Sequence, residues 1–198
     1  MIEIVLLIIL YFTVFAVIHS FTASLYFKRK IRCRLGPFVD KVYLPVYSLL
    51  ALLTISPLVY LIYNNPGSII YIIPTPWFWV MISIQVIAAL VAPRALTDAP
   101  HRFKLRLQLG QVDNKELNHL KIKGIYKWIR DPFLLSGLVI IWFTPFMTLN
   151  LLLIYVLITI YLVFGSFHWE KRLVEQFGTE YKEYQTEVNR ILPRVPNK

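Results

Sequence analysis

Residues 2–27 read IEIVLLIILYFTVFAVIHSFTASLYF, and Lys28-Arg29-Lys30 follow at once. A helix needs about 20 mostly apolar residues to cross the hydrocarbon core of a bilayer, and this stretch is long enough. It has no basic start and no small-residue cleavage site after it, which distinguishes it from a secretory signal peptide. We therefore predict a retained first transmembrane helix that ends at a basic segment.

Further apolar runs repeat this pattern along the chain. They cover residues 43–63, 77–96, 132–147 and 149–169. The chain has 198 residues, of which 57% are hydrophobic and only 16% charged, whereas about a quarter of the residues in a soluble domain are charged. We predict an all-α, polytopic integral membrane bundle of about five transmembrane helices, forming a single membrane domain over residues 1–198.

The basic residues predict the orientation of this bundle. All 21 Lys and Arg fall within three blocks, at residues 28–41, 94–130 and 171–198. Five spans put the three blocks on one side, which the positive-inside rule makes cytoplasmic. We expect an inner-membrane protein with its N-terminus outside and its C-terminus in the cytoplasm. Because the blocks alternate with apolar runs, the net charge of +10 does not indicate a nucleic-acid partner.

Two polar segments complete the predicted topology. Residues 97–131 form the longest one, a cytoplasmic loop suited to act as a lid or cofactor loop. Residues 170–198 form a cytoplasmic helix and tail, because apolar residues recur along 170–188 with the spacing of an amphipathic helix. We expect this helix to break or bend at Gly178.

Ionisable side chains near membrane depth are the first candidates for chemistry, because burying them there is costly. His19 lies near the inner end of the first predicted span, and His168 and Glu170 lie near the inner end of the last. Each also has an ordinary explanation: a helix-end histidine can bond a hydroxyl or headgroup, and Glu170 can pair with a neighbouring basic residue such as Arg130. The lone Cys33 excludes a disulfide or a cysteine-based zinc site within one chain.

Arg130 and Asp131 precede Pro132, a residue well suited to the first turn of a helix. A basic segment beside a helix start can receive a carboxylate or a cofactor tail. Lipid phosphates are the common alternative ligand of such a segment, and membrane lipids are therefore expected partners. The spacing of these residues does not distinguish a carboxylate or cofactor tail from a lipid phosphate as the ligand.

Several short motifs in the second half occur in a fixed order. They are Gly124-Ile-Tyr126, Arg130-Asp-Pro132, Glu170-Lys-Arg-Leu173, Phe177-Gly-Thr-Glu-Tyr181-Lys-Glu-Tyr184 and Leu192-Pro193. In this order they resemble the superfamily of isoprenylcysteine carboxyl methyltransferases and phospholipid methyltransferases. His19-Ser20 and the stretch 142–148 are similar to its NnrU and methanethiol S-methyltransferase branch.

The resemblance implies a methyltransferase that uses S-adenosylmethionine at the cytoplasmic face and methylates a small thiol or a lipophilic substrate. It implies catalytic roles for Arg130 and Glu170 and no metal. The implied cofactor-binding residues are Tyr126, Arg130, Asp131, Pro132, Leu192 and Pro193. Catalysis would rest mainly on the alignment of donor and acceptor.

Two positions depart from the family pattern. Asp131 replaces the family histidine of Arg-His-Pro, and Leu134 replaces a tyrosine. A carboxylate only accepts hydrogen bonds when ionised, and it would repel the carboxylate of the methyl donor. This leaves two alternatives open: a non-catalytic subunit of a membrane complex, and an NnrU-like protein that holds haem b between His19 and His168.

Overall fold

The computed structural model describes residues 2–98, 120 and 122–192, and the chain divides into two compact units. The first unit contains the described residues 2–71 and 147–157. The second contains 72–98, 120, 122–146 and 158–192. Each unit combines segments from distant parts of the chain.

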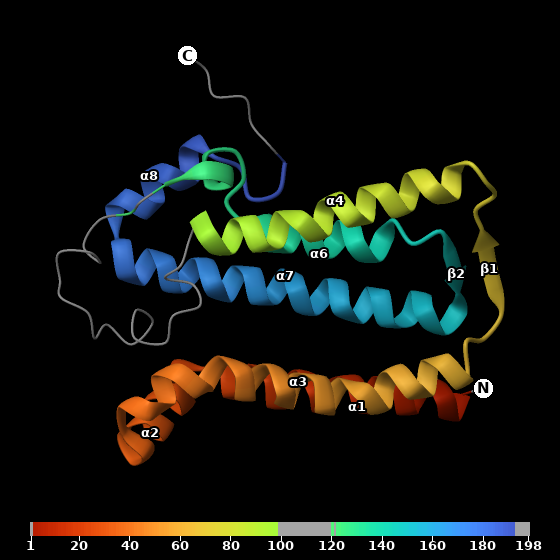
Figure 1. Ribbon diagram of the computed structural model, residues 1–198, viewed down its shortest axis with the longest axis horizontal. Helices are drawn as coiled ribbons and strands as arrows, with labels where there is room; N and C mark the ends of the chain where they lie inside the picture. Colours follow the sequence, from red (N-terminus) through yellow and green to blue (C-terminus); the bar gives the residue numbers. More distant parts are fainter. Residues whose placement is uncertain (1, 99–119, 121, 193–198) are drawn as a thin grey trace. The chain divides into compact units, whose positions relative to one another are not determined.

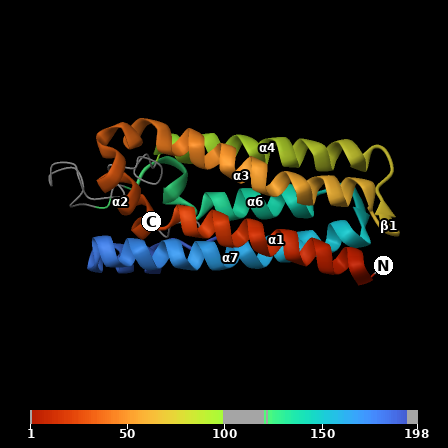
Figure 2. The same cartoon turned by 90° about the horizontal axis from the view of Figure 1, so that it is seen from below.

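The first unit is built on two long apolar helices. Helices α1 (Ile2–Ala23) and α3 (Val39–Asn64) lie side by side (Figures 1 and 2). Between them stand the short helix α2 (Leu25–Leu35) and the 3-10 turn η1 (Gly36–Phe38). Ser24 separates α1 from α2, because its extended backbone interrupts the first helix and its hydroxyl accepts a bond from the Phe27 amide at 3.2 Å.

Helix α2 is an ordered part of this unit, whereas the sequence indicated only a basic segment at residues 28–41. The Arg32 guanidinium pairs with both carboxylate oxygens of Asp40, at 2.8 and 3.1 Å. Val39 is buried against Leu25 and Ile31 from α2. A two-bond ion pair and a small apolar core thus attach α2 to the start of α3.

The second unit packs α4 (Trp77–Asp98) beside α6 (Pro132–Trp142) (Figures 1 and 2). It also contains η3 (Gly124–Lys127), α8 (Thr179–Glu187), and helix α7 (Leu149–Phe177) from residue 158 onward. A β-carbon added to Gly137 of α6 would lie 3.0 Å from Leu162 of α7. The Trp142 indole donates to the Thr159 hydroxyl at 2.9 Å. These contacts show that α6 and α7 run antiparallel.

Helix α6 ends at Trp142, five residues before the predicted end of that span. Pro145 cannot supply a helical amide bond, and its carbonyl accepts the Ile73 amide at 2.8 Å. Strand β2 (Phe146–Thr148) then pairs with β1 (Ile69–Ile72) in a two-stranded sheet. An 11-residue helix is about 16 Å long, so this span would cross the membrane only together with the extended residues after it.

The described residues contain four helices that are long and apolar enough to cross a membrane. They are Ile2–Ala23, the continuous stretch Leu25–Asn64, Trp77–Asp98 and Leu149–Phe177. The shorter apolar helix Pro132–Trp142 accompanies them. The prediction of an all-α membrane bundle is confirmed, with the small β1–β2 sheet as an addition.

Candidate functional site

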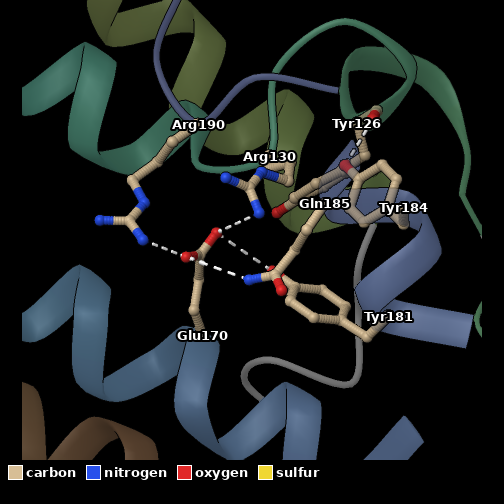
Figure 3. Close-up of polar contacts among 7 residues, drawn as sticks. All are labelled: Tyr126, Arg130, Glu170, Tyr181, Tyr184, Gln185 and Arg190. Carbon is tan, nitrogen blue, oxygen red and sulfur yellow. Dashed lines mark hydrogen bonds and ion pairs between the residues drawn. The ribbon is translucent and has the colours of Figure 1, made fainter. Parts of the chain in front are cut away.

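Glu170 is the centre of a buried polar cluster in the second unit. The residue is only 4% exposed. Its Oε1 atom lies 3.1 Å from Arg130 Nη1, and its Oε2 atom pairs with Arg190 Nη2. The Tyr181 hydroxyl donates to Oε1 at 3.4 Å and the Gln185 amide to Oε2 at 3.5 Å. Figure 3 shows these four side chains converging on the carboxylate.

The turn at Gly178 brings two of these partners back to Glu170. Helix α7 ends at Phe177, Gly178 takes a left-handed φ of 56°, and α8 starts at Thr179. The reversal turns Tyr181 and Tyr184 toward α7, where they form a core with Leu173 and Val188. Glycine adopts this backbone without the penalty that a β-carbon brings.

The segment after α8 supplies Arg190 by pairing with the chain that leads into α6. The Arg130 amide donates to the Asn189 carbonyl at 3.0 Å, and the Asp131 amide donates to the Arg190 carbonyl at the same distance. The Arg190 guanidinium lies 3.9 Å above the ring of Phe167. Both arginines are therefore held by backbone bonds and packing as well as by their charges.

Asp131 caps helix α6. Its carboxylate accepts the Leu134 amide at 3.1 Å, and the residue is 2% exposed. Pro132 occupies the first turn of the helix and is fully buried. An aspartate at this position satisfies an amide that the helix itself leaves unpaired. This local role accounts for a carboxylate where the family resemblance led us to expect histidine.

Tyr126 and Gly124 connect the cluster to α4. The Tyr126 carbonyl accepts the Tyr184 hydroxyl at 2.5 Å (Figure 3), and the Tyr126 hydroxyl lies 3.4 Å from the Ala95 carbonyl. Gly124 has a φ of 53°, and an added β-carbon would lie 1.9 Å from a carboxylate oxygen of Asp98. The glycine of Gly-x-Tyr is thus required both by its backbone and by the close approach of α4.

Burial raises the pKa of both Tyr181 and Tyr184 above the ordinary value of 10.0. For Tyr181 the neighbouring negative charge of Glu170 raises it further. Both phenols are consequently neutral throughout the physiological pH range. Tyr181 can therefore act as a hydrogen-bond donor to Glu170 without adding a second negative charge.

The cluster has donor capacity that its own residues do not use. The Nε atoms of Arg130 and Arg190 are buried and have no hydrogen-bond partner among the described residues. Two guanidinium groups flank the Glu170 carboxylate, and the Asp131 carboxylate caps the adjoining helix α6. This combination fits a ligand end that carries an ammonium and a carboxylate together, because each charge finds an opposite partner.

The structure brings together only some of the residues that we selected from the sequence. Arg130 and Glu170 form an ion pair, and Tyr126, Asp131 and Pro132 lie in the same unit. Leu192 is 72% exposed, and Pro193 lies outside the described residues.

The two histidines of the haem alternative lie in different units. His19 is in the first unit, where its Nε2 lies 2.6 Å from the Tyr47 hydroxyl. His168 is an exposed residue of α7 in the second unit. Among the described residues, no group of three or more His, Cys, Asp or Glu is arranged to hold a metal ion.

Sequence reasoning did not select Arg190, Gln185, Tyr181 or Tyr184 as site residues. The two tyrosines belong to the Phe-Gly-x-x-Tyr-x-x-Tyr motif, so the motif could have identified them as site residues. Arg190 was counted only as part of the last basic block. Its position two residues before Leu192-Pro193 is the signal that could have singled it out.

The spanning helices and the buried Arg130–Glu170–Arg190 cluster define an integral membrane helical protein with a polar site at a helix start. The profile of the family described as NnrU protein matches residues 7–192. The chain belongs to the NnrU family.

Relatives of the chain include proteins named methanethiol S-methyltransferase. The protein from Pseudomonas deceptionensis is 39% identical over 71 residues, which cover 36% of this chain and 27% of the relative. A second, from Crocosphaera subtropica, is 31% identical over 98 residues, or 48% of this chain and 38% of the relative. Methanethiol S-methyltransferase 2 from Bradyrhizobium diazoefficiens is 28% identical over 134 residues, or 62% and 52%.

The matched parts therefore cover only 27%, 38% and 52% of the lengths of these three relatives. No solved structure matches the chain.

Proposed function

We propose that this protein transfers a methyl group from S-adenosylmethionine to a small thiol or lipophilic acceptor at the cytoplasmic face of the membrane. The observation that carries the proposal is the buried cluster of two arginines around the Glu170 carboxylate, with two guanidinium Nε atoms left to donate. The names of the relatives support the same reaction class.

The residues of the cluster fit the methionine end of this cofactor. Arg130 and Arg190 would hold its carboxylate, and Glu170 would accept hydrogen bonds from its ammonium group. The bound cofactor would supply an electrophilic methyl group on a sulfonium. Tyr126, Asp131 and Pro132 would shape the cofactor side of the site by fixing the start of α6.

The protein's own contribution is orientation and the exclusion of water. Glu170 is held from four directions, so a ligand bonded to it has a defined position relative to α7. Methyl transfer needs the donor and acceptor sulfurs in line with the carbon between them, and fixing that geometry removes much of the entropic barrier. No residue of the cluster has to take up a proton for this.

The basic segments support an orientation with the cluster on the cytoplasmic side of the inner membrane. In this arrangement the N-terminus lies outside and the C-terminus inside. A water-soluble cofactor would enter from the cytoplasm, whereas an apolar acceptor would enter from the lipid. Membrane lipids are the expected partners.

Calorimetric titration of the purified protein with S-adenosylhomocysteine tests the proposal. We expect saturable binding that is lost in Arg130→Gln and retained in Lys182→Gln, which changes an exposed residue of α8. Absence of binding in the wild-type protein would rule out the enzyme. Stoichiometric copurifying proteins would then indicate the non-catalytic subunit, and a Soret band lost in His19→Ala would indicate the haem protein.

A further inference from the structure

Two buried serines behave differently from the other helical hydroxyls of this chain. Ser136 of α6 is 3% exposed and Ser166 of α7 is 4% exposed. Neither hydroxyl has a hydrogen-bond partner among the described residues. A buried hydroxyl without a partner costs free energy, so each needs an explanation.

Serine and threonine within apolar helices usually bond to the carbonyl four residues earlier. Other hydroxyls of this chain do so, including Thr13 to Ile9 at 2.7 Å, Thr54 to Leu50 at 2.8 Å and Ser83 to Trp79 at 2.8 Å. Ser136 and Ser166 could each have made the same local bond. Neither makes that bond among the described residues.

The two serines lie on the same stretch of the paired helices. Arg130 pairs with Glu170 at one end of this stretch, and Gly137 contacts Leu162 further along. Ser136 falls between Arg130 and Gly137, and Ser166 falls between Leu162 and Glu170. Ser166 also lies four residues before Glu170, and therefore on the same face of α7, one turn further into the apolar part of the helix.

We propose that Ser136 and Ser166 bind the sulfur of the methyl acceptor, and that this acceptor is an alkyl thiol bound as its thiolate. This inference rests on the proposed function and names its substrate class. Two hydroxyl donors suit an anionic sulfur with several lone pairs. An amine acceptor would have its single lone pair occupied by such donors and could not attack.

The methyl transfer to a thiolate needs no base in the site. The thiol loses its proton to water before it binds. The thiolate sulfur then forms a bond to the methyl carbon, and the bond from that carbon to the sulfonium sulfur breaks. The thiolate becomes a thioether, and the sulfonium takes the bonding electron pair and also becomes a neutral thioether. Glu170, already paired with two arginines, is not needed as a proton acceptor.

The test compares Ser136→Ala, Ser166→Ala and the double variant with Ser83→Ala, which removes an exposed, back-bonded hydroxyl. Ethanethiol is the acceptor. We expect KM for the thiol to rise about ten-fold for each buried hydroxyl removed, which is typical of a hydrogen bond to a charged group. Affinity for S-adenosylhomocysteine and the unfolding temperature should not fall, since each change also removes an unpartnered polar group. Ser83→Ala should change none of these values.

The pH profile gives a second readout. Because the thiolate is the bound form, kcat/KM for ethanethiol should rise about ten-fold per pH unit below the pKa of the thiol. An unchanged KM in both alanine variants would overturn the inference, as would methylation of an amine in place of the thiol. Loss of S-adenosylhomocysteine binding together with stability would also overturn it, by showing a structural role. If the wild-type protein binds no S-adenosylhomocysteine, the proposed function itself fails.

Discussion

At the level of single residues, Asp131 shows how a departure from a family pattern can have a local cause. Its carboxylate accepts the Leu134 amide and caps α6. We expect Asp131→Ala to lower the free energy of unfolding by about 1 kcal/mol, whereas Asp131→Asn, which keeps an acceptor, should cost much less. Thermal unfolding in detergent measures both. Equal losses in the two variants would show that the charge, and not the cap, is what matters.

Glu170 is the residue on which the cluster depends most. Glu170→Gln would leave the guanidinium groups of Arg130 and Arg190 buried beside a neutral amide. Removing one partner of a buried ion pair costs about 3–5 kcal/mol of stability. We expect the free energy of unfolding to fall by an amount near the lower end of this range, because Arg190 is partly exposed. The matched control is Glu183→Gln, at an exposed position of α8.

The double variant Glu170→Gln/Arg190→Gln tests the same explanation. It should recover part of the lost stability, because one unpaired charge is removed. Equal unfolding temperatures for Glu170→Gln and Glu183→Gln would contradict the importance of the cluster.

At the level of elements, two glycines with nearly the same positive φ can be compared. Gly124 has a φ of 53° and Gly178 a φ of 56°. An alanine at Gly178 meets nothing within 4 Å and should cost about 1–3 kcal/mol, the penalty for a residue in a sparsely populated backbone region. An alanine at Gly124 is also strained by a positive φ, and it would in addition overlap the Asp98 carboxylate.

We therefore expect Gly124→Ala to be clearly more destabilising than Gly178→Ala. Chemical unfolding of the two variants in detergent gives the comparison. Similar free energies of unfolding for the two variants would mean that Asp98 moves aside at little cost and that η3 is not fixed against α4.

Which parts of the elements could be predicted depends on where their stability comes from. The long helices were predictable because apolar runs of bilayer length are a local property of the chain. The end of α6 at Trp142 was not, because residues after it form backbone bonds with a strand far away in the sequence. The ordered helix α2 was not predicted for the same reason, because its Arg32–Asp40 ion pair and the core at Val39 are tertiary contacts.

At the level of the whole molecule, the single cysteine allows the orientation to be tested. Cys33 is exposed and belongs to the basic segment expected in the cytoplasm. A membrane-impermeant maleimide should label it in permeabilised cells and leave it unlabelled in intact cells. In the Cys33→Ser background, Asn64→Cys at the far end of α3 should show the opposite result. Labelling of Cys33 from outside would reverse the predicted topology.

The sequence by itself determined the membrane-bundle class. It also predicted that the basic side faces the cytoplasm, and it offered Arg130 as one of several possible partners of Glu170. These follow from composition, run length and charge, which are read along the chain. Only the tertiary structure decided that Arg190, Tyr181 and Gln185 complete the Glu170 site, and that Asp131 caps a helix. Such roles depend on a turn at Gly178 and on backbone pairing between residues 130–131 and 189–190. A side chain's partners are set by how distant segments pack, and no local pattern specifies that.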